Sequence, residues 1–266
     1  MTIDIEILQF LYYHPLANRT EIMAGLMETP SGSTVKRLLS AAVKEGNIET
    51  VGRGPSTKYR LTPQAHVTMP LDLATYFDKD IDERVVQKSF NFDLIREVLP
   101  KVEIFTKEEL SVLFAAQKEF EKNTEGMTEL EYHKEMERLG VDLSWKSSQI
   151  EGNTYSLLET ERLLKDKQTA SGKTKEEAIM LLNHKDALDF VLDVPDYLKE
   201  LSVHRIEDIH SILTKELGVD RNIRHRRVGI TGTNYRPLDN EFQIREALED
   251  TCTLVNGKDN VFEKAL

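Results

Sequence analysis

The sequence predicts a mainly α-helical protein with two parts, a small amino-terminal domain and a larger helical body. Apolar residues recur at the three- to four-residue spacing of helices along most of the 266 residues. Charge separates the two parts. Residues 1–65 hold 7 Lys and Arg against 6 Asp and Glu, whereas the remainder holds 28 against 40 and makes the net charge of the chain -11. We therefore place the first boundary at residue 65.

The first part contains signals for three helices and a β-hairpin. Three segments repeat apolar residues at helical spacing and end near Pro, Gly or Asn. They are residues 4–13, 20–27 and 34–45. Thr20 is the expected cap of the second helix. Residues 48–51 and 58–61 are expected to be strands, joined by a tip that is rich in Gly and carries Arg53.

Three helices followed by such a hairpin resemble a winged helix-turn-helix domain. The resemblance implies that the third helix enters a DNA major groove and that the hairpin contacts phosphates. The residues expected at the DNA are Thr34, Lys36, Arg37, Arg53 and Lys58. Protein–protein recognition by the same fold stays open, because residues 1–65 carry nearly balanced charge and would neutralise few phosphates.

Residues 66–100 are predicted to connect the two parts. Three prolines lie in or beside this segment, and charged residues are dense over residues 78–84. Residues 90–95 contain enough apolar side chains to pack on a neighbour. We therefore expect a connector that packs on the body rather than a free tether.

Helical patterns return in the second part, where Thr106 is expected to cap a helix. Residues 131–139 predict another helix, which leads after Gly140 into residues 147–153, Ser-Ser-Gln-Ile-Glu-Gly-Asn. This last segment is the most informative in the chain, because it puts a carboxylate where a helix should end.

Glu151 is expected in the last turn of that helix, because Gly152 and Asn153 tolerate the left-handed conformation that ends helices. A carboxylate there faces the negative end of the helix dipole, which costs about 0.3–1 kcal/mol unless a cation compensates. A cation is therefore expected near Glu151. Ser147 lies four residues earlier on the same helical face, so its hydroxyl and the carboxylate are expected to project toward one neighbour.

Residues 147–153 resemble the inhibitory helix motif of Fic proteins, in which Ser or Thr, three residues, Glu and then Gly or Asn block nucleotide binding. The resemblance extends over residues 101–266 and implies an all-helical Fic-type core with a β-hairpin flap. The inhibitory residues would be Ser147, Glu151, Gly152 and Asn153. Other residues that agree with the family core are Thr154, Leu158, Glu159, Glu161, Gly172, Lys173, Glu176, Glu177, Ala178, Asn183, Ala187 and Leu188.

Residues 226–237, Arg-Arg-Val-Gly-Ile-Thr-Gly-Thr-Asn-Tyr-Arg-Pro, are similar to the β-hairpin flap that holds a target segment in that family. β-Branched residues flank two glycines, and an exposed strand edge can accept a target backbone by strand addition. The implied docking residues are Val228, Gly229, Ile230, Thr231, Gly232 and Tyr235. The implied nucleotide-binding residues are Glu151, Thr231, Gly232, Thr233 and Asn234. An ordinary surface loop remains the alternative.

Fic proteins transfer AMP from ATP to a side-chain hydroxyl, so the resemblance implies a protein adenylyltransferase that uses ATP with Mg²⁺. Its chemistry belongs to a loop reading HxFx(D/E)GN(G/K)R, which supplies the base, a metal ligand, phosphate donors and an arginine. None of the seven histidines begins such a loop. No catalytic residue and no metal ligand is therefore expected in these 266 residues, which by themselves should be inactive.

Residues 259–266 look like the start of the helix that leads into the catalytic loop. We expect the ligands of the metal and nucleotide beyond Leu266, with truncation as the preferred explanation and natural degeneration as the alternative. His204 and Asp208 are spaced as metal ligands could be, but the apolar face of the same helix favours a solvated pair, and no metal site is predicted.

The expected partners are a target protein that presents a Ser, Thr or Tyr hydroxyl and DNA bound through residues 1–65. The alternative function is a DNA-binding regulator with a non-catalytic Fic-like body. Cys252 is the only cysteine, which excludes an internal disulfide. No apolar run approaches the roughly 20 residues that cross a bilayer, and the first residues lack a secretion signal. We expect a cytoplasmic protein without membrane contact, and homo-oligomers are compatible with the sequence.

Overall fold

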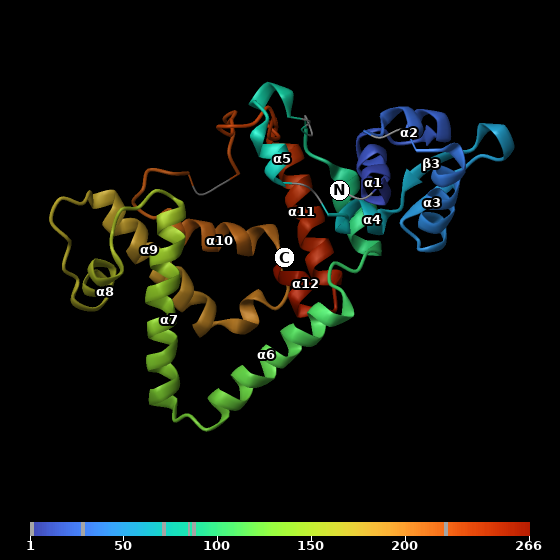
Figure 1. Cartoon of the computed structure of the whole chain (residues 1–266). Coiled ribbons are helices and arrows are strands. Elements are labelled where there is room, and N and C mark those ends of the chain that lie inside the picture. Colours follow the sequence, from blue (N-terminus) through green and yellow to red (C-terminus); the bar gives the residue numbers. More distant parts are fainter. Residues whose placement is uncertain (1–2, 28–29, 71–72, 85, 87–88, 221–222) are drawn as a thin grey trace. The chain divides into compact units, whose positions relative to one another are not determined.

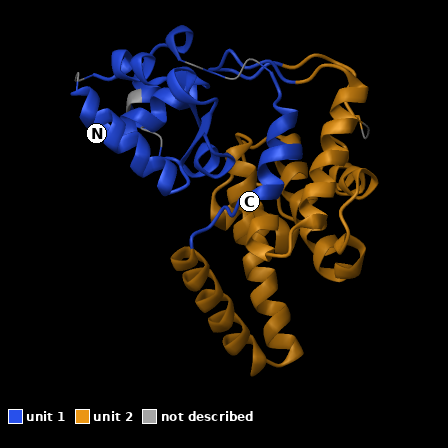
Figure 2. Cartoon of the chain, turned by 90° about the vertical axis from the view of Figure 1, so that its right-hand side faces the viewer, with its two compact units in different colours: residues 1–106, 229–237 blue, residues 107–228, 238–266 orange. Residues whose placement is uncertain are grey.

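The computed structural model describes residues 3–27, 30–70, 73–84, 86, 89–220 and 223–266. The chain divides into two compact units (Figures 1 and 2). Unit 1 comprises Met1–Thr106 and Gly229–Pro237, and unit 2 comprises Lys107–Val228 and Leu238–Leu266. The described residues are mainly helical with one small antiparallel sheet, which confirms the mainly α prediction in this coarse form. None of the helices in the described part of the chain has the length and apolar character to span a membrane.

Unit 1 contains the expected three helices and two strands, together with a short extra strand that completes a sheet of order β1-β3-β2. Strands β2 and β3 have the predicted bounds, and Ile48 lies opposite Leu61. Strand β1 is too short to show alternation in the sequence. The elements are α1 (Ile3–Tyr13), β1 (Ala17–Asn18), α2 (Arg19–Gly25), α3 (Gly32–Lys44), β2 (Ile48–Val51), η1 (Gly54–Ser56), β3 (Lys58–Leu61), α4 (Pro63–Thr68), α5 (Leu73–Asp78), η2 (Ile81–Glu83), η3 (Leu94–Val98) and η4 (Leu99–Lys101).

The core of unit 1 is formed by apolar side chains that recur at helical spacing in the sequence. Helices α1, α2 and α3 contribute side chains that are almost fully shielded from solvent, and strand β2 adds another. The central residues are Ile7 and Leu11 of α1, Ile22 of α2, Val35 and Leu39 of α3, and Ile48 of β2. Burial of large aliphatic side chains of this kind contributes about 1.5–3 kcal/mol each.

Two helix starts differ from the prediction. Asn18, not Thr20, caps α2, because its side-chain oxygen reaches the backbone N–H groups of both Thr20 and Glu21 at 2.9 and 3.0 Å. The carboxylate of Glu21 in turn accepts a hydrogen bond from the backbone N–H of Asn18, which completes a capping box. Helix α3 begins two residues before the expected Thr34, because the Ser31 side chain supplies its cap.

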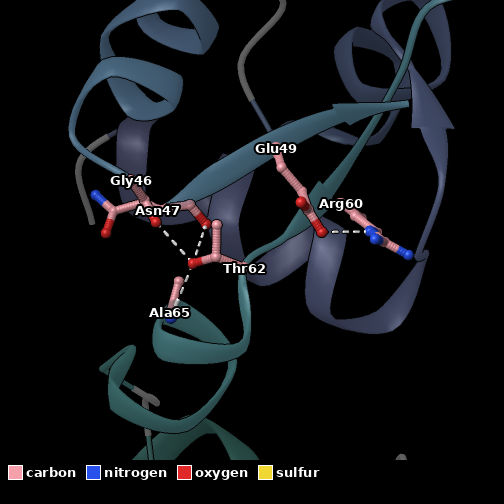
Figure 3. A network of polar contacts seen from close by, with 6 residues as sticks. All are labelled: Gly46, Asn47, Glu49, Arg60, Thr62 and Ala65. Carbon is pink, nitrogen blue, oxygen red and sulfur yellow. Dashed lines mark hydrogen bonds and ion pairs between the residues drawn. The ribbon is translucent and has the colours of Figure 1, made fainter. Parts of the chain in front are cut away.

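Thr62 joins the sheet to α4 (Figure 3). Its hydroxyl donates to the carbonyl of Gly46 at 2.7 Å and accepts from the backbone N–H of Ala65 at 3.2 Å, so one side chain caps α4 and holds the turn after α3. Beside it, the Arg60 guanidinium pairs with Glu49 across β3 and β2 at 2.5 Å.

The first domain therefore continues past the boundary expected at residue 65. Ala65 and Met69 are buried in the core of unit 1. The side chain of Gln64 exchanges two hydrogen bonds with the backbone of Glu103, at 2.6 and 3.0 Å. These bonds tie the chain just after the expected connector to α4, and residues 66–106 are grouped with unit 1.

Unit 2 consists of helices, and α7 packs on α8 and α9 while α10 packs on α9. Helix α7 runs without a break through Gly140, so the predicted helix over residues 131–139 was too short. A Cβ at Gly140 would lie 3.5 Å from the side chain of Lys185, which shows how closely α9 approaches there. The helices are α6 (Lys107–Glu125), α7 (Glu129–Ile150), α8 (Leu157–Asp166), α9 (Lys175–Asp193), η5 (Pro195–Leu198), α10 (Val203–Leu213), α11 (Glu241–Gly257) and α12 (Val261–Ala265).

Thr62→Ala is expected to lower the free energy of unfolding of unit 1 by about 1–2 kcal/mol, because the cap of α4 and the bond to Gly46 are lost together. Urea unfolding followed by circular dichroism measures this loss, and fluorescence of Trp145, which lies in unit 2, should keep its midpoint. Thr68→Ala removes a hydroxyl bonded to the preceding turn of α4 and is the matched control. Equal losses in the two variants would contradict the role of Thr62.

Candidate functional site: the carboxyl end of helix α7

Helix α7 ends in a Schellman motif built on Gly152. The backbone N–H of Gly152 donates to Gln149 O at 3.0 Å, and that of Asn153 donates to Ser148 O at 2.9 Å. Gly152 has φ +88°, the left-handed conformation that the motif requires. The prediction that Gly152 stops this helix is confirmed.

Asn153 then ties the end of α7 to α9. Its side chain is 7% exposed, its Nδ2 donates to the carbonyl of Glu177 at 2.8 Å, and its Oδ1 accepts from the backbone N–H of Tyr155 at 3.0 Å. The carbonyl of Tyr155 in turn accepts from the indole N–H of Trp145 at 2.9 Å. Asn153, expected as an inhibitory residue, is thus a buried junction that fixes the position of its neighbours.

Glu177 reinforces the same junction from the first turn of α9. One carboxylate oxygen accepts from the hydroxyl and backbone N–H of Thr154 at 2.6 and 2.8 Å, and the other accepts from the N–H of Thr174 at 2.9 Å. The hydroxyl of Thr154 and the two backbone donors lower the pKa of Glu177 to about 2. Lys173 donates to the carbonyl of Thr154 at 2.5 Å. Sequence reasoning gave Glu177 no role, although its spacing from Thr174 is that of a capping box.

Glu151 lies outside this network, at the cap position of α7. Its side chain is exposed, and its carboxylate forms no hydrogen bond or ion pair with the residues that the structure describes. The imidazole of His184 on α9 is half-buried, so its pKa is lowered by burial, and the Glu151 carboxylate opposes that shift. Glu151 therefore interacts electrostatically with a histidine whose burial disfavours the cationic imidazole that would compensate the charge at the helix end.

The two serines of the motif differ in exposure. Ser147 is half-buried one turn before Glu151, as its spacing predicts, whereas Ser148 is fully buried. The hydroxyls of Ser148 and Ser144 have no hydrogen-bond partner among the described residues. Their small side chains allow the close approach of neighbouring helices, and of the two motif serines only Ser147 remains accessible together with Glu151.

The prediction of a β-hairpin over residues 226–237 is wrong. Within the described residues 223–240 there is no strand, and the chain only turns at Thr231 and Gly232. Two glycines weaken any strand here, and polar side chains find partners outside the segment: Arg227 pairs with Asp239 at 2.7 Å.

The predicted docking and nucleotide residues fall in this irregular segment. Val228 and Ile230 are exposed by 49% and 52%, Thr231 and Gly232 form the exposed turn, and the hydroxyl of Thr233 accepts from the N–H of Tyr235 at 3.2 Å. The remaining predicted residues are Gly229 and Asn234. Residues 229–237 belong to unit 1, whereas Glu151 belongs to unit 2.

A second candidate surface lies on α3 and the turn between β2 and β3. Its exposed basic side chains form no ion pair with any residue that the structure describes. They are Lys36, Arg37, Arg53 and Lys58. Thr34, the fifth predicted DNA contact, is half-buried and shares a hydrogen bond of 2.9 Å with the capping hydroxyl of Ser31. Gly52 and Gly54 adopt positive φ, which shapes the tip that carries Arg53.

His204 and Asp208 do approach one another, at 3.5 Å, and the Asp208 carboxylate also accepts from the hydroxyl of Tyr197 at 2.5 Å. In the described ranges no group of three or more His, Cys, Asp or Glu side chains is arranged to hold a metal ion.

Comparison with protein-family models, with curated proteins and with solved structures finds no match to this chain. The family resemblance therefore rests on the residues of the sequence.

Glu151→Gln is expected to lower the pKa of His184 further, because the carboxylate is the group that raises it against the effect of burial. The imidazole proton signals in an NMR titration measure the shift. Glu137→Gln removes an exposed carboxylate from the same helix and should leave the titration of His184 unchanged. An unchanged pKa in the Glu151 variant would show that the two side chains do not interact.

Proposed function

We propose that this chain is the regulatory part of a Fic-type protein adenylyltransferase, which transfers AMP from ATP to a hydroxyl of a target protein and is restrained by Glu151. The observation that carries the proposal is an exposed carboxylate at a rigidly anchored helix end, which has no ion-pair partner among the residues that the structure describes. A residue that blocks a nucleotide site has to be fixed in space and has to keep its charge available for a cationic partner. The Schellman motif and the buried Asn153 supply the first property, and the exposure of Glu151 supplies the second.

In this proposal, Glu151 pairs with an arginine of a catalytic loop that is not among these 266 residues, and Ser147 hydrogen-bonds the same region. A charge-assisted pair of this kind contributes about 1.5–3 kcal/mol, enough to hold the arginine away from the phosphates of ATP. Thr231, Gly232, Thr233 and Asn234 would border the nucleotide, and Val228, Gly229, Ile230 and Tyr235 would contact the target. ATP would enter with Mg²⁺, as the resemblance to the Fic family implies. We propose a cytoplasmic location, which the free Cys252 and the need for ATP support.

Glu151→Ala is expected to raise AMP transfer by about tenfold or more in a chain extended through the catalytic loop that the proposal requires, since the restraining ion pair is removed. Incorporation of radioactive AMP from labelled ATP measures the rate. The 266 residues alone should incorporate none.

Glu137→Ala, which removes an exposed carboxylate of α7 about four turns before Glu151, is the matched control and should keep the unmutated rate. Equal rates for Glu151→Ala and the parent would remove the inhibitory role. Incorporation absent from every extended variant would remove the transferase itself.

A second function is favoured by a separate observation, the unpaired basic side chains on α3 and the adjoining turn. We propose that unit 1 binds duplex DNA, with α3 in the major groove and Arg53 and Lys58 on phosphates. Arg60 is excluded from this surface because it pairs with Glu49. The near-neutral charge of residues 1–65 means that affinity would come from these few placed cations rather than from a broad basic field.

The double variant Arg53→Ala/Lys58→Ala is expected to weaken duplex binding at low salt. The slope of log affinity against log salt should become shallower by about 1.8, because about 0.9 counterion is released per phosphate contact. Fluorescence anisotropy of a labelled mixed-sequence duplex measures both quantities. Lys118→Ala/Lys122→Ala on α6 removes the same charge from unit 2 and should leave binding unchanged. A parent chain without salt-sensitive binding would refute the DNA-binding function.

A further inference from the structure

The segment Gly229–Pro237 is grouped with unit 1 although residues of unit 2 precede and follow it (Figure 2). It contains no strand, and its turn is set by Gly232 with φ +82°. The bond from Tyr235 to Thr233 is local and cannot hold the segment to another part of the chain. A contact other than strand pairing must therefore connect it to unit 1.

Asn234 provides that contact. Its side-chain Nδ2 donates to Asp82 Oδ1 at 3.2 Å and lies 3.4 Å from the carbonyl oxygen of Ile81, 153 residues away in the sequence. One of the acceptors is charged, which makes the bond stronger than one between neutral groups. The amide thus binds a backbone carbonyl and an adjacent carboxylate together.

The receiving loop, residues 77–84, is held closed by Arg84. The guanidinium donates to the carbonyls of Lys79 and Phe77 at 2.9 and 3.0 Å, and it lies 5.4 Å from the centre of the Phe77 ring. Because these bonds order the loop independently of Asn234, little further conformational entropy is lost when the amide binds.

We propose that residues 77–84 bind the segment Gly229–Pro237 in the place that the target protein would take. The loop thus acts as an internal substitute for the target. This inference rests on the proposed transferase, in which the same segment holds the target, and it adds a contact with the target to the place of Asn234 beside the nucleotide. The Asn234 amide is engaged by a carbonyl and a carboxylate, and an extended target segment with an Asp or Glu would offer the same two groups. A target has to displace the loop before it docks, and the favoured targets present an acidic residue beside an apolar one, as Ile81 and Asp82 do.

Asp82→Ala is expected to speed amide hydrogen exchange over residues 229–236 by about threefold, because a single exposed hydrogen bond to a charged group is lost. Asn234→Ala should have the same effect from the other side of the contact. Glu83→Ala removes the neighbouring exposed carboxylate, which does not contact Asn234, and is the matched control. Exchange rates that are the same in all three variants and the parent would overturn the inference.

Labelling of an added protein with AMP provides the second measurement, on the chain extended through the catalytic loop. Asp82→Ala should raise this labelling about threefold while Glu83→Ala does not, and unchanged labelling would overturn the inference. Faster exchange in Asp82→Ala combined with no activation by Glu151→Ala would instead refute the transferase, and the substitution for a target with it. Activation by Glu151→Ala with no effect of Asp82→Ala would refute the internal substitute alone.

Discussion

The buried amide of Asn153 is the interaction on which the arrangement of unit 2 depends. An amide that is 7% exposed loses its water, so both its donor and its acceptor need partners within the protein. Those partners are the carbonyl of Glu177 in α9 and the N–H of Tyr155, which lies just before α8. Satisfying them fixes the end of α7, the start of α8 and the start of α9 with respect to one another.

The position of Glu151 is a consequence of that junction. Two residues before Asn153, the helix closes its last carbonyls with Gly152 in the left-handed conformation, and the side chain at the cap position is left in solvent. The protein thus keeps a charge at an electrostatically unfavourable helix end while the residues around it are tightly bonded. Stability alone would favour a cation or a neutral residue there, which is the physical argument for a function of Glu151.

In unit 1, as in unit 2, side-chain hydrogen bonds to the backbone join segments that are distant in the sequence. Thr62 and Gln64 are side chains that bond backbone groups of distant segments, the turn at Gly46 and the chain at Glu103. These bonds hold α4 and the following chain against the three-helix core, while Lys36 and Arg37 on the surface of α3 form no ion pair with the residues that the structure describes. Among the described residues, Glu151 of unit 2 and the four basic side chains of the DNA-binding candidate surface in unit 1 form no ion pair, so their charges remain available to a partner.

The sequence by itself determined the features that depend on a few neighbouring residues. The apolar period located α1 and α3, alternation located β2 and β3 to the residue, and Gly152 marked the end of α7, because each of these signals acts within one or two turns. It misplaced the cap of α2, since Asn18 and Thr20 are both good caps and only the path of the chain selects between them. It also predicted a hairpin over residues 226–237 that the protein does not form.

Tertiary structure alone decided which partners those residues meet. Asn153 finds Glu177 at a separation of 24 residues, and Asn234 finds Asp82 at 152. No local pattern encodes such pairs, because they arise only when helices and loops from different parts of the chain pack together. The same packing sets the surroundings of Glu151: the sequence required a compensating cation, and the fold placed beside it the half-buried imidazole of His184, whose pKa burial lowers.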